Sequence, residues 1–133
     1  MKSRPFRLTA LKPRESDLQR QIMDYLAVEQ ARKRVIWYCR VNGGAVKKGL
    51  RWIKFYVLYL LGKRPISKGK SDIEGMLPGG KYFALEVKQP GEKAMPEQLD
   101  FLEAVRDGGG IAAVVFSFND VKSVLFGELD WKR

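Results

Sequence analysis

The sequence predicts an α/β fold in which helices flank a mixed central sheet, and three observations support this prediction. Apolar residues recur at helical spacing over residues 13–32. Two apolar runs flank the turn sequence Pro78-Gly79-Gly80, which is typical of a β-hairpin. A second helical pattern opens at Pro96, and the continuous apolar run 111–117 that follows it is typical of a strand buried on both faces.

The first part of the chain contains an arm, a helix and a strand. Residues 1–12 are basic and aperiodic, so we expect a loose basic arm. Pro13 suits the first turn of the helix predicted over 13–32. Five residues of this helix follow helical spacing, namely Leu18, Ile22, Tyr25, Leu26 and Glu29, and the apolar members form one inward stripe. The β-branched and aromatic run 35–41 predicts a strand, which Asn42-Gly43-Gly44 would end.

The segment 45–70 interleaves basic and aromatic residues. Its apolar residues fit a helical stripe, so we expect a helix at about 50–61 that ends at Gly62, with a second strand as the alternative. The aromatic residues exceed what one stripe can bury, which indicates either a helix packed on two sides or a subunit interface. Basic and aromatic residues together also suit a nucleic-acid surface. The residues that we expect to contact DNA are Lys47, Lys48, Arg51, Lys68 and Lys70.

The last part of the chain contains a helix, a strand and a short final helix. Pro96 opens the first of these helices, and the glycine run 108–110 breaks it before the apolar strand 111–117. Asn119 or Asp120 would then cap a helix at 121–125. The sequence contains no internal repeat and no long linker, so we expect residues 1–133 to form a single domain.

The register of the central hairpin determines which polar side chains meet. If Pro78-Gly79-Gly80 forms a three-residue loop, Leu77 pairs with Lys81. Counting outward from that pair, Asp72 lies directly across from Glu86. A two-residue loop would shift Asp72 by one position, and the side chains would then alternate differently.

Two directly opposed carboxylates are the strongest chemical signal in the sequence. Like charges that face each other across a sheet are destabilising. A divalent cation between Asp72 and Glu86 would remove the conflict, and carboxylate oxygens suit magnesium. Lys88 shares a face with Glu86, so it would direct its ammonium group at an anion bound to the metal.

Glu15 and Gln98 are two further polar residues that face inward. Glu15 lies three residues before Leu18, at the start of the first helix. It either interacts with the positive end of the helix dipole or presents a third carboxylate to the metal site. Gln98 points inward near the loop that follows Lys88, and a buried glutamine needs partners. It either caps the loop backbone or helps to hold water or phosphate at the site.

Composition limits the possible functions. The chain has a net charge of +10, which favours an anionic partner, nucleic acid first and a membrane surface second. It has no histidine, which excludes a Ser-His-Asp triad, a histidine general base and a His/Cys zinc site. Its one cysteine cannot form a disulfide within the chain, which favours a reducing compartment. No apolar h-region follows the first four residues, so we expect no signal peptide. The longest apolar stretch, 55–61, is far shorter than the ~20 residues that span a bilayer.

Four short stretches together resemble a known nuclease family. Asp72, then Glu86-Val87-Lys88 after a turn, then Gln98 on the next helix, resemble the pattern of the PD-(D/E)xK nucleases. More specifically, E-S-D-L-Q-R-Q-I, S-D-I-E-G, E-V-K-Q-P-G-E-K and P-E-Q-L-D-F-L resemble the VRR-NUC branch over about residues 15–117. Two features depart from the family: Ser71 replaces the proline before Asp72, and the aromatic insert at 50–61 has no counterpart.

The resemblance implies a restriction-endonuclease-like αβββαβ core and assigns roles to individual residues. It implies that Asp72 and Glu86 bind Mg²⁺, or Mn²⁺ as a substitute, together with the backbone carbonyl of Val87. Lys88 resembles the lysine that positions or activates the attacking water. Glu15 resembles a first-helix glutamate near the metal, acting through water, and Gln98 an accessory glutamine.

The resemblance also implies a function, although alternatives stay open. Small members of the family resemble phage or bacterial enzymes that act on branched DNA as homodimers. We therefore expect a cytoplasmic endonuclease, in a bacterium or phage-infected cell, that resolves Holliday junctions as a homodimer. The alternatives are a flap or single-strand nuclease of the same chemistry and a basic DNA-binding module without catalysis.

Overall fold

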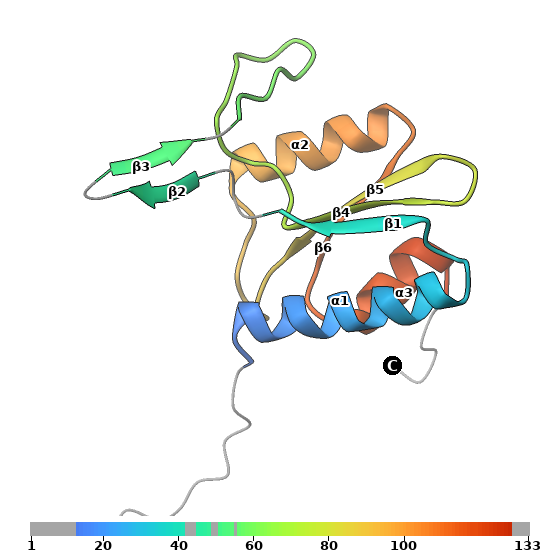
Figure 1. Cartoon of the computed structure of the whole chain (residues 1–133). Helices are drawn as coiled ribbons and strands as arrows, with labels where there is room; N and C mark the ends of the chain where they lie inside the picture. Colours follow the sequence, from blue (N-terminus) through green and yellow to red (C-terminus); the bar gives the residue numbers. More distant parts are fainter. Residues whose placement is uncertain (1–12, 42–44, 49–50, 55, 129–133) are drawn as a thin grey trace, which may run out of the picture.

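A four-stranded mixed sheet forms the centre of the protein in the computed structural model (Figure 1). The structure describes residues 13–41, 45–48, 51–54 and 56–128, without the side chains of 45–48 and 51–54. The predicted basic arm 1–12 lies outside these residues. The elements are α1 (Glu15–Ala31), β1 (Trp37–Arg40), β2 (Ala45–Lys48), β3 (Arg51–Lys54), β4 (Ile73–Leu77), β5 (Lys81–Val87), α2 (Pro96–Asp107), β6 (Ile111–Val115) and α3 (Phe118–Phe126).

The strand order β1-β4-β5-β6 places the β4–β5 hairpin at the centre of the sheet, as predicted. β1, β4 and β5 are antiparallel neighbours, whereas β5 and β6 are parallel and are joined by the α2 crossover. In chain order α1, β1, β4, β5, α2 and β6 give the αβββαβ core that the sequence predicted. The α/β fold with a mixed central sheet is therefore confirmed.

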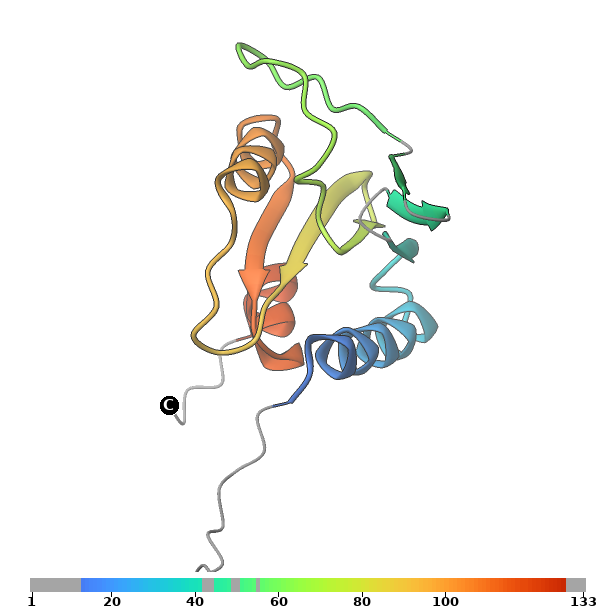
Figure 2. The same ribbon diagram turned by 90° about the vertical axis from the view of Figure 1, so that its left-hand side faces the viewer.

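The helices form a layer on each face of the sheet, α1 and α3 on one and α2 on the other (Figures 1 and 2). This division follows from the alternation of side chains along β5. Phe83, Leu85 and Val87 pack into the core that α1 and α3 cover. Ala84 packs into the smaller core under α2, together with Phe101, Leu102 and Ala112.

The hairpin turn has the register that brings Asp72 opposite Glu86. The amide of Gly80 donates to the carbonyl of Leu77 at 3.2 Å. Gly79 and Gly80 have φ angles of +87° and +83°, which favour glycine because it has no Cβ. The ladder then runs from Leu77 opposite Lys81 to Ile73 opposite Leu85. The three-residue loop expected from the sequence is therefore confirmed.

The helix predicted at 50–61 is wrong. β2 and β3 instead form a separate two-stranded sheet, and in Figure 1 this hairpin projects beyond the end of the central sheet. Residues 56–60 then lie outside any helix or strand, and Leu58 forms a bridge with Ile66. A turn begins at Leu61. Leu58 and Leu60 pack against the core under α2, whereas the residues between and after them are exposed. Gly62, with φ +76°, forms part of a turn and does not end a helix.

The start of α3 also differs from the prediction. Neither Asn119 nor Asp120 is the N-cap; Ser117 is, and its side chain accepts a hydrogen bond from the Asp120 amide at 3.2 Å. The Asp120 carboxylate in turn accepts from the amide of Phe116 at 2.8 Å. The helix is therefore longer than the predicted 121–125. No helix in the described part of the chain has the length and apolar character needed to span a membrane.

Candidate active site

Asp72 and Glu86 lie at the end of the central hairpin, just beyond the last paired residues of β4. The last pair of the ladder is Ile73 and Leu85, so the next position places Asp72 opposite Glu86. The carboxylate of Asp72 accepts a hydrogen bond from the Val87 amide at 2.8 Å. This side-chain bond continues the ladder by one step and fixes Asp72 beside β5.

Glu86 is a deeply buried carboxylate, with only 1% of the residue exposed. Gln98 donates to its Oε1 at 2.8 Å, and among the described residues Oε2 has no hydrogen-bond partner. Burial first, and the neighbouring Asp72 carboxylate second, raise the pKa of Glu86 to about 9. Glu86 is therefore a buried carboxylate that faces a second carboxylate, and its Oε2 forms no hydrogen bond with the described residues. These are the properties of a cation ligand.

Lys88 lies on the same face as Glu86, as predicted from the alternation along the strand. Its Nζ is 3.7 Å from Glu86 Oε1, and its side chain is only 12% exposed. The amide of Lys88 donates to the carbonyl of Val115 on β6 at 3.0 Å. The lysine is therefore held by the sheet and places a fixed positive charge beside the two carboxylates.

Gln98 fulfils the first of the two roles that the sequence left open, since it caps the loop backbone, and it also contacts Glu86. Its part in holding water or phosphate stays a prediction. Because α2 begins at Pro96, Gln98 lies in its first turn and faces the end of the sheet. Its Oε1 accepts from the Met95 amide at 2.8 Å, and its Nε2 donates to Glu86. Gln98 thus caps the loop that enters α2 and orients one oxygen of Glu86.

Glu15 is the first residue of α1 and lies near the site. Burial raises its pKa most, the Asp72 carboxylate adds to this, and Lys88 acts in the opposite direction. Among the described residues, no three carboxylate or cysteine groups are arranged to hold a metal ion. The structure therefore brings Asp72 and Glu86 together as the acidic pair, and the participation of Glu15 through water stays a prediction.

The donor groups at this end of the sheet fit a small hard cation. A strand residue directs its amide and its carbonyl toward the same neighbouring strand. The Val87 carbonyl therefore lies on the side of β5 where its amide contacts Asp72. Two carboxylates and a carbonyl are oxygen ligands of the kind that magnesium binds, with water completing its coordination.

Gln89 is a site residue that the sequence reasoning missed. Its Nε2 donates to the carbonyl of Pro13 at 2.6 Å, and its amide donates to Glu92 at 3.3 Å. The first of these bonds attaches the loop after β5 to Pro13, which precedes α1 and Glu15, and the second lies within the loop. No sequence signal indicated this role, apart from the position of Gln89 directly after Lys88.

Two of the lysines predicted to contact DNA form ion pairs. Lys68 lies 3.6 Å from Glu97, and Lys70 lies 3.2 Å from Glu74. Gly69, between them, has φ +105° and approaches the backbone of Glu97 so closely that a Cβ would collide with it. This approach holds the basic loop against the start of α2. The side chains of Lys47, Lys48 and Arg51 lie outside the described residues.

Replacing Gln98 by alanine is expected to weaken metal binding about 10- to 100-fold, because groups that orient metal ligands contribute by that amount. The substitution removes the hydrogen bond that fixes Glu86. Titration calorimetry with Mn²⁺ measures the affinity. The matched control is Leu99→Ala, on the exposed side of the same helix. Equal affinities for the wild-type protein and Gln98→Ala would contradict this role of Gln98.

In comparisons with known proteins, no family model and no curated protein matches this chain. The functional interpretation therefore depends on the geometry of the residues described above.

Proposed function

We propose that the protein is a magnesium-dependent, structure-specific DNA endonuclease that hydrolyses phosphodiester bonds in branched DNA. The observation that carries this proposal is the pair formed by Asp72 and the buried Glu86, beside Lys88. Two such opposed carboxylates repel each other when both are ionised, and a cation between them offsets that repulsion. The pattern also supports membership of the VRR-NUC branch of the PD-(D/E)xK nucleases.

The proposed mechanism assigns a separate task to each polar group of the site. A bound magnesium ion would act as a Lewis acid on the phosphodiester and offset the charge that develops during hydrolysis. Asp72 and Glu86 would hold this ion, and Gln98 keeps Glu86 in the orientation that leaves Oε2 free. Lys88 contributes a fixed positive charge at the point where the phosphate becomes more negative.

The proposed partners follow from charge and symmetry. A net charge of +10 attracts the DNA backbone through phosphate contacts and counterion release. Resolution of a four-way junction needs two symmetric cuts, which a twofold homodimer supplies through two related sites. We accordingly propose Holliday-junction resolution by a homodimer in a reducing cytoplasm.

Incubation with a labelled four-way junction tests the proposal. With Mg²⁺ or Mn²⁺, the wild-type protein is expected to introduce paired nicks, and EDTA is expected to abolish them. The Asp72→Asn variant is expected to be inactive but folded, because the asparagine oxygen can still accept from the Val87 amide. Its DNA affinity should be unchanged or higher, since the substitution removes one negative charge.

The other outcomes distinguish the alternatives. Cleavage of flaps without paired nicks in junctions would remove the resolvase assignment and leave the metal-dependent chemistry. DNA binding without any cleavage at any metal concentration would instead indicate a non-catalytic DNA-binding module. In that case Asp72→Asn would change no measured property, and Mg²⁺ would not alter the melting temperature.

A further inference from the structure

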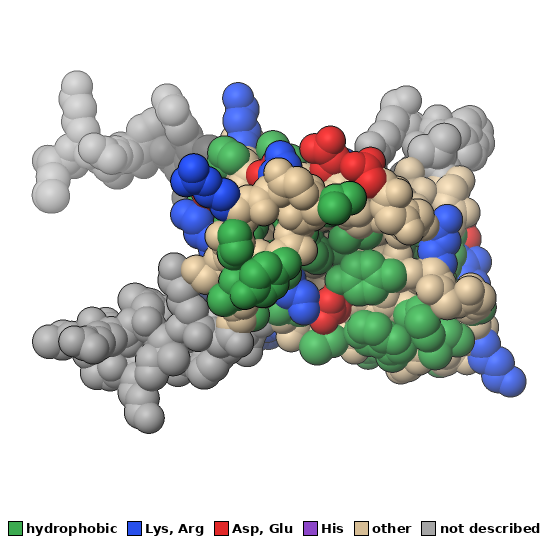
Figure 3. All heavy atoms as spheres, turned by 90° about the horizontal axis from the view of Figure 1, so that it is seen from above, with side chains coloured by type: hydrophobic (Ala, Val, Ile, Leu, Met, Phe, Trp, Pro, Cys, Tyr) green, Lys and Arg blue, Asp and Glu red, His purple; other side chains and the backbone are tan. Residues whose placement is uncertain are grey.

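Within the described ranges of the chain, the sheet face that carries the site is only partly covered. On this face α2 lies over β5 and β6, and the described segment 58–60 packs with it. In the half formed by β1 and β4, the exposed side chains belong to β1, the edge strand of the sheet, whereas Glu74 and Met76 of β4 are half-buried. Figure 3 views the molecule from the α2 side and shows hydrophobic side chains interspersed with acidic and basic ones.

The strand register aligns this open face with the catalytic carboxylates. Paired residues share a face, and so do residues two positions apart on one strand. The residues on the α2 side therefore form rows across the sheet. Each row lies two residues further along the strands than the one before it, in the direction of the site. The rows are Trp37 with Met76 and Tyr82, then Cys39 with Glu74 and Ala84, then Asp72 with Glu86.

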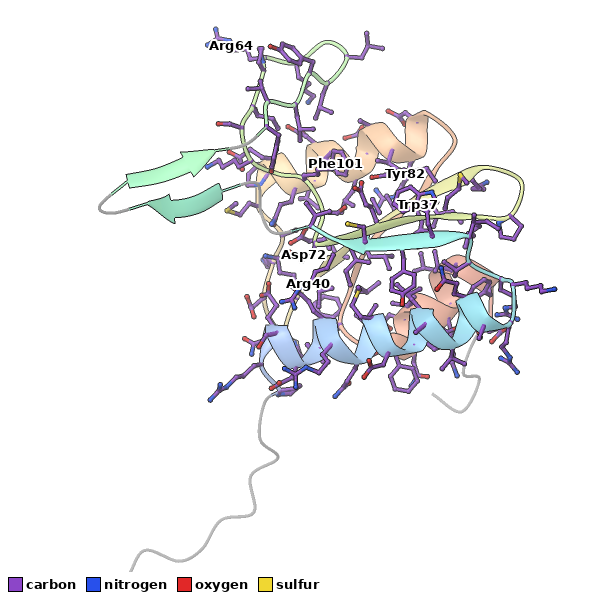
Figure 4. The ribbon with its side chains drawn as sticks, viewed as in Figure 1. Trp37, Arg40, Arg64, Asp72, Tyr82 and Phe101 are labelled. Atoms are coloured by element: carbon purple, nitrogen blue, oxygen red, sulfur yellow. The ribbon has the colours of Figure 1, made fainter. Side chains whose placement is uncertain are left out.

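Trp37 is the most accessible aromatic residue of these rows. It is 39% exposed, whereas Met76 and Tyr82 are half-buried beside it. Figure 4 labels Trp37 and Tyr82 on the α2 side of the sheet and Asp72 toward the end where the site lies. This row thus presents part of the Trp37 side chain to solvent on the same face as the site.

The polar groups between Trp37 and the site argue against an apolar protein contact. The Tyr82 hydroxyl donates to Glu74 at 2.6 Å, and Lys70 donates to the same carboxylate at 3.2 Å. A hydrophobic interface core is depleted in such charged groups. An exposed aromatic ring near a basic group is a feature of single-strand nucleic-acid binding. Here Trp37 supplies the ring and Lys70, which is paired with Glu74, the basic group, and the net charge of +10 favours a polyanion.

The distance between Trp37 and the site matches a short length of DNA strand. Four residues of β4 separate the row of Met76 from Asp72, which corresponds to about 13 Å. Stacked nucleotides advance about 3.4 Å each along one strand, and unstacked nucleotides advance further. A base that reaches Trp37 is therefore about two to four nucleotides from a phosphate held at the site.

We propose that Trp37 is a stacking platform for an unpaired base of the strand that is cut, so that the preferred substrate has single-stranded nucleotides at its branch point. Bases inside a duplex already stack on both faces, so only an unpaired base can lie on an indole ring. This inference rests on the proposed nuclease function and adds to it the substrate class that the site accepts.

The first test measures binding without metal, independently of cleavage. A short oligothymidylate is expected to bind the wild-type protein, and Trp37→Ala is expected to weaken that binding about tenfold, the usual effect of removing one stacking partner. Trp37→Phe keeps an aromatic ring and should restore most of the affinity. Val28→Ala, on an exposed position of α1, is the matched control and should leave the affinity unchanged.

The second test compares cleavage of two junctions, one fully paired and one with a few unpaired thymidines at the branch point. The wild-type protein should cleave the second with a KM about tenfold lower and a similar kcat, because stacking adds binding without touching the reacting phosphate. In Trp37→Ala this difference should disappear. Equal KM values of the wild-type protein for both junctions would overturn the inference while leaving the nuclease function intact.

Two further outcomes separate the two proposals. If the wild-type protein cleaves no DNA but Trp37→Ala still weakens oligothymidylate binding, the stacking site stands and the proposed nuclease function fails. Sedimentation of wild-type and Trp37→Ala proteins provides the remaining check. Conversion of a dimer to a monomer by Trp37→Ala would show that this face contacts a second copy, and would overturn the stacking role.

Discussion

Replacing Glu86 by glutamine is expected to reduce magnesium-dependent cleavage by about 10³-fold, because a lost metal ligand removes several kcal/mol of transition-state stabilisation. The same substitution should stabilise the metal-free protein. Glu86 is buried beside Asp72, and no group in the described part of the chain forms a hydrogen bond with its Oε2, so its charge is unfavourable without a cation. Glutamine keeps the shape of the side chain and can still accept from Gln98.

The pH dependence of stability is expected to differ between the wild-type protein and Glu86→Gln. Burial and Asp72 raise the pKa of Glu86 from 4.5 to about 9, so between these pH values the folded protein binds a proton that the unfolded chain has lost. The stability of the metal-free wild-type protein should therefore fall as pH rises through this interval. This contribution should be absent from Glu86→Gln, and at pH 8 its melting temperature should be higher.

Thermal unfolding in EDTA and in Mg²⁺, together with single-turnover cleavage, checks these expectations. Magnesium should raise the melting temperature of the wild-type protein but not that of Glu86→Gln. Glu103→Gln makes the same charge change at an exposed position of α2 and is the matched control. Wild-type cleavage rates in Glu86→Gln would refute the assignment of Glu86 as a metal ligand.

Replacing Gly75 by alanine is expected to destabilise the protein by about 3 kcal/mol, the upper part of the range for overpacked cores. Gly75 pairs with Phe83 in the centre of the hairpin. A Cβ at Gly75 would overlap the Phe83 ring and the backbone carbonyl of Trp37. Neither group can move aside easily, because Phe83 is fully buried and the carbonyl belongs to the neighbouring strand.

Thermal denaturation measures this effect, and the melting temperature should fall by about 10 °C. Gly108→Ala is the control, since a Cβ there would lie at an ordinary 3.4 Å from its nearest neighbour and the φ angle of −80° suits alanine. That variant should be neutral or slightly stabilised. A fall of less than about 2 °C in Gly75→Ala would mean that the hairpin accommodates a methyl group.

The central hairpin and its register were predictable because the local signals agreed. Pro78-Gly79-Gly80 specifies a tight turn, and strict alternation along residues 82–88 specifies which side chains share a face. The opposed position of Asp72 and Glu86 then followed by counting from the turn. Gln98 was predictable for the same reason, since its helix begins at Pro96 and its inward stripe is regular.

The segment 50–61 was not predictable in the same way, because its apolar residues fit both the helical spacing and the alternation of a strand. Leu50, Ile53 and Val57 suggest a helix, but from Tyr56 to Leu61 every second residue faces inward. Which period prevails depends on the surface that the segment meets, here the core under α2 that receives Leu58 and Leu60. Tertiary packing of this kind leaves no signal in a short apolar run.

Side-chain partners across the fold were equally inaccessible from the sequence. Lys70 and Glu74 are four residues apart, yet their ion pair depends on how the loop enters β4. Gln89 contacts the carbonyl of Pro13, 76 positions away in the chain. Contacts between segments so far apart depend on the finished fold and not on local periodicity.

The bond between the Lys88 amide and the Val115 carbonyl has a consequence for biosynthesis. The parallel partner of β5 is β6, which is made after the whole α2 crossover, so a ribosome must synthesise the chain as far as β6 before Lys88 can be fixed. A nascent chain that ends earlier has both carboxylates but no rigid strand to hold the lysine beside them. On the proposed nuclease function, such a truncated product would lack the fixed positive charge beside the carboxylates and would not cleave DNA.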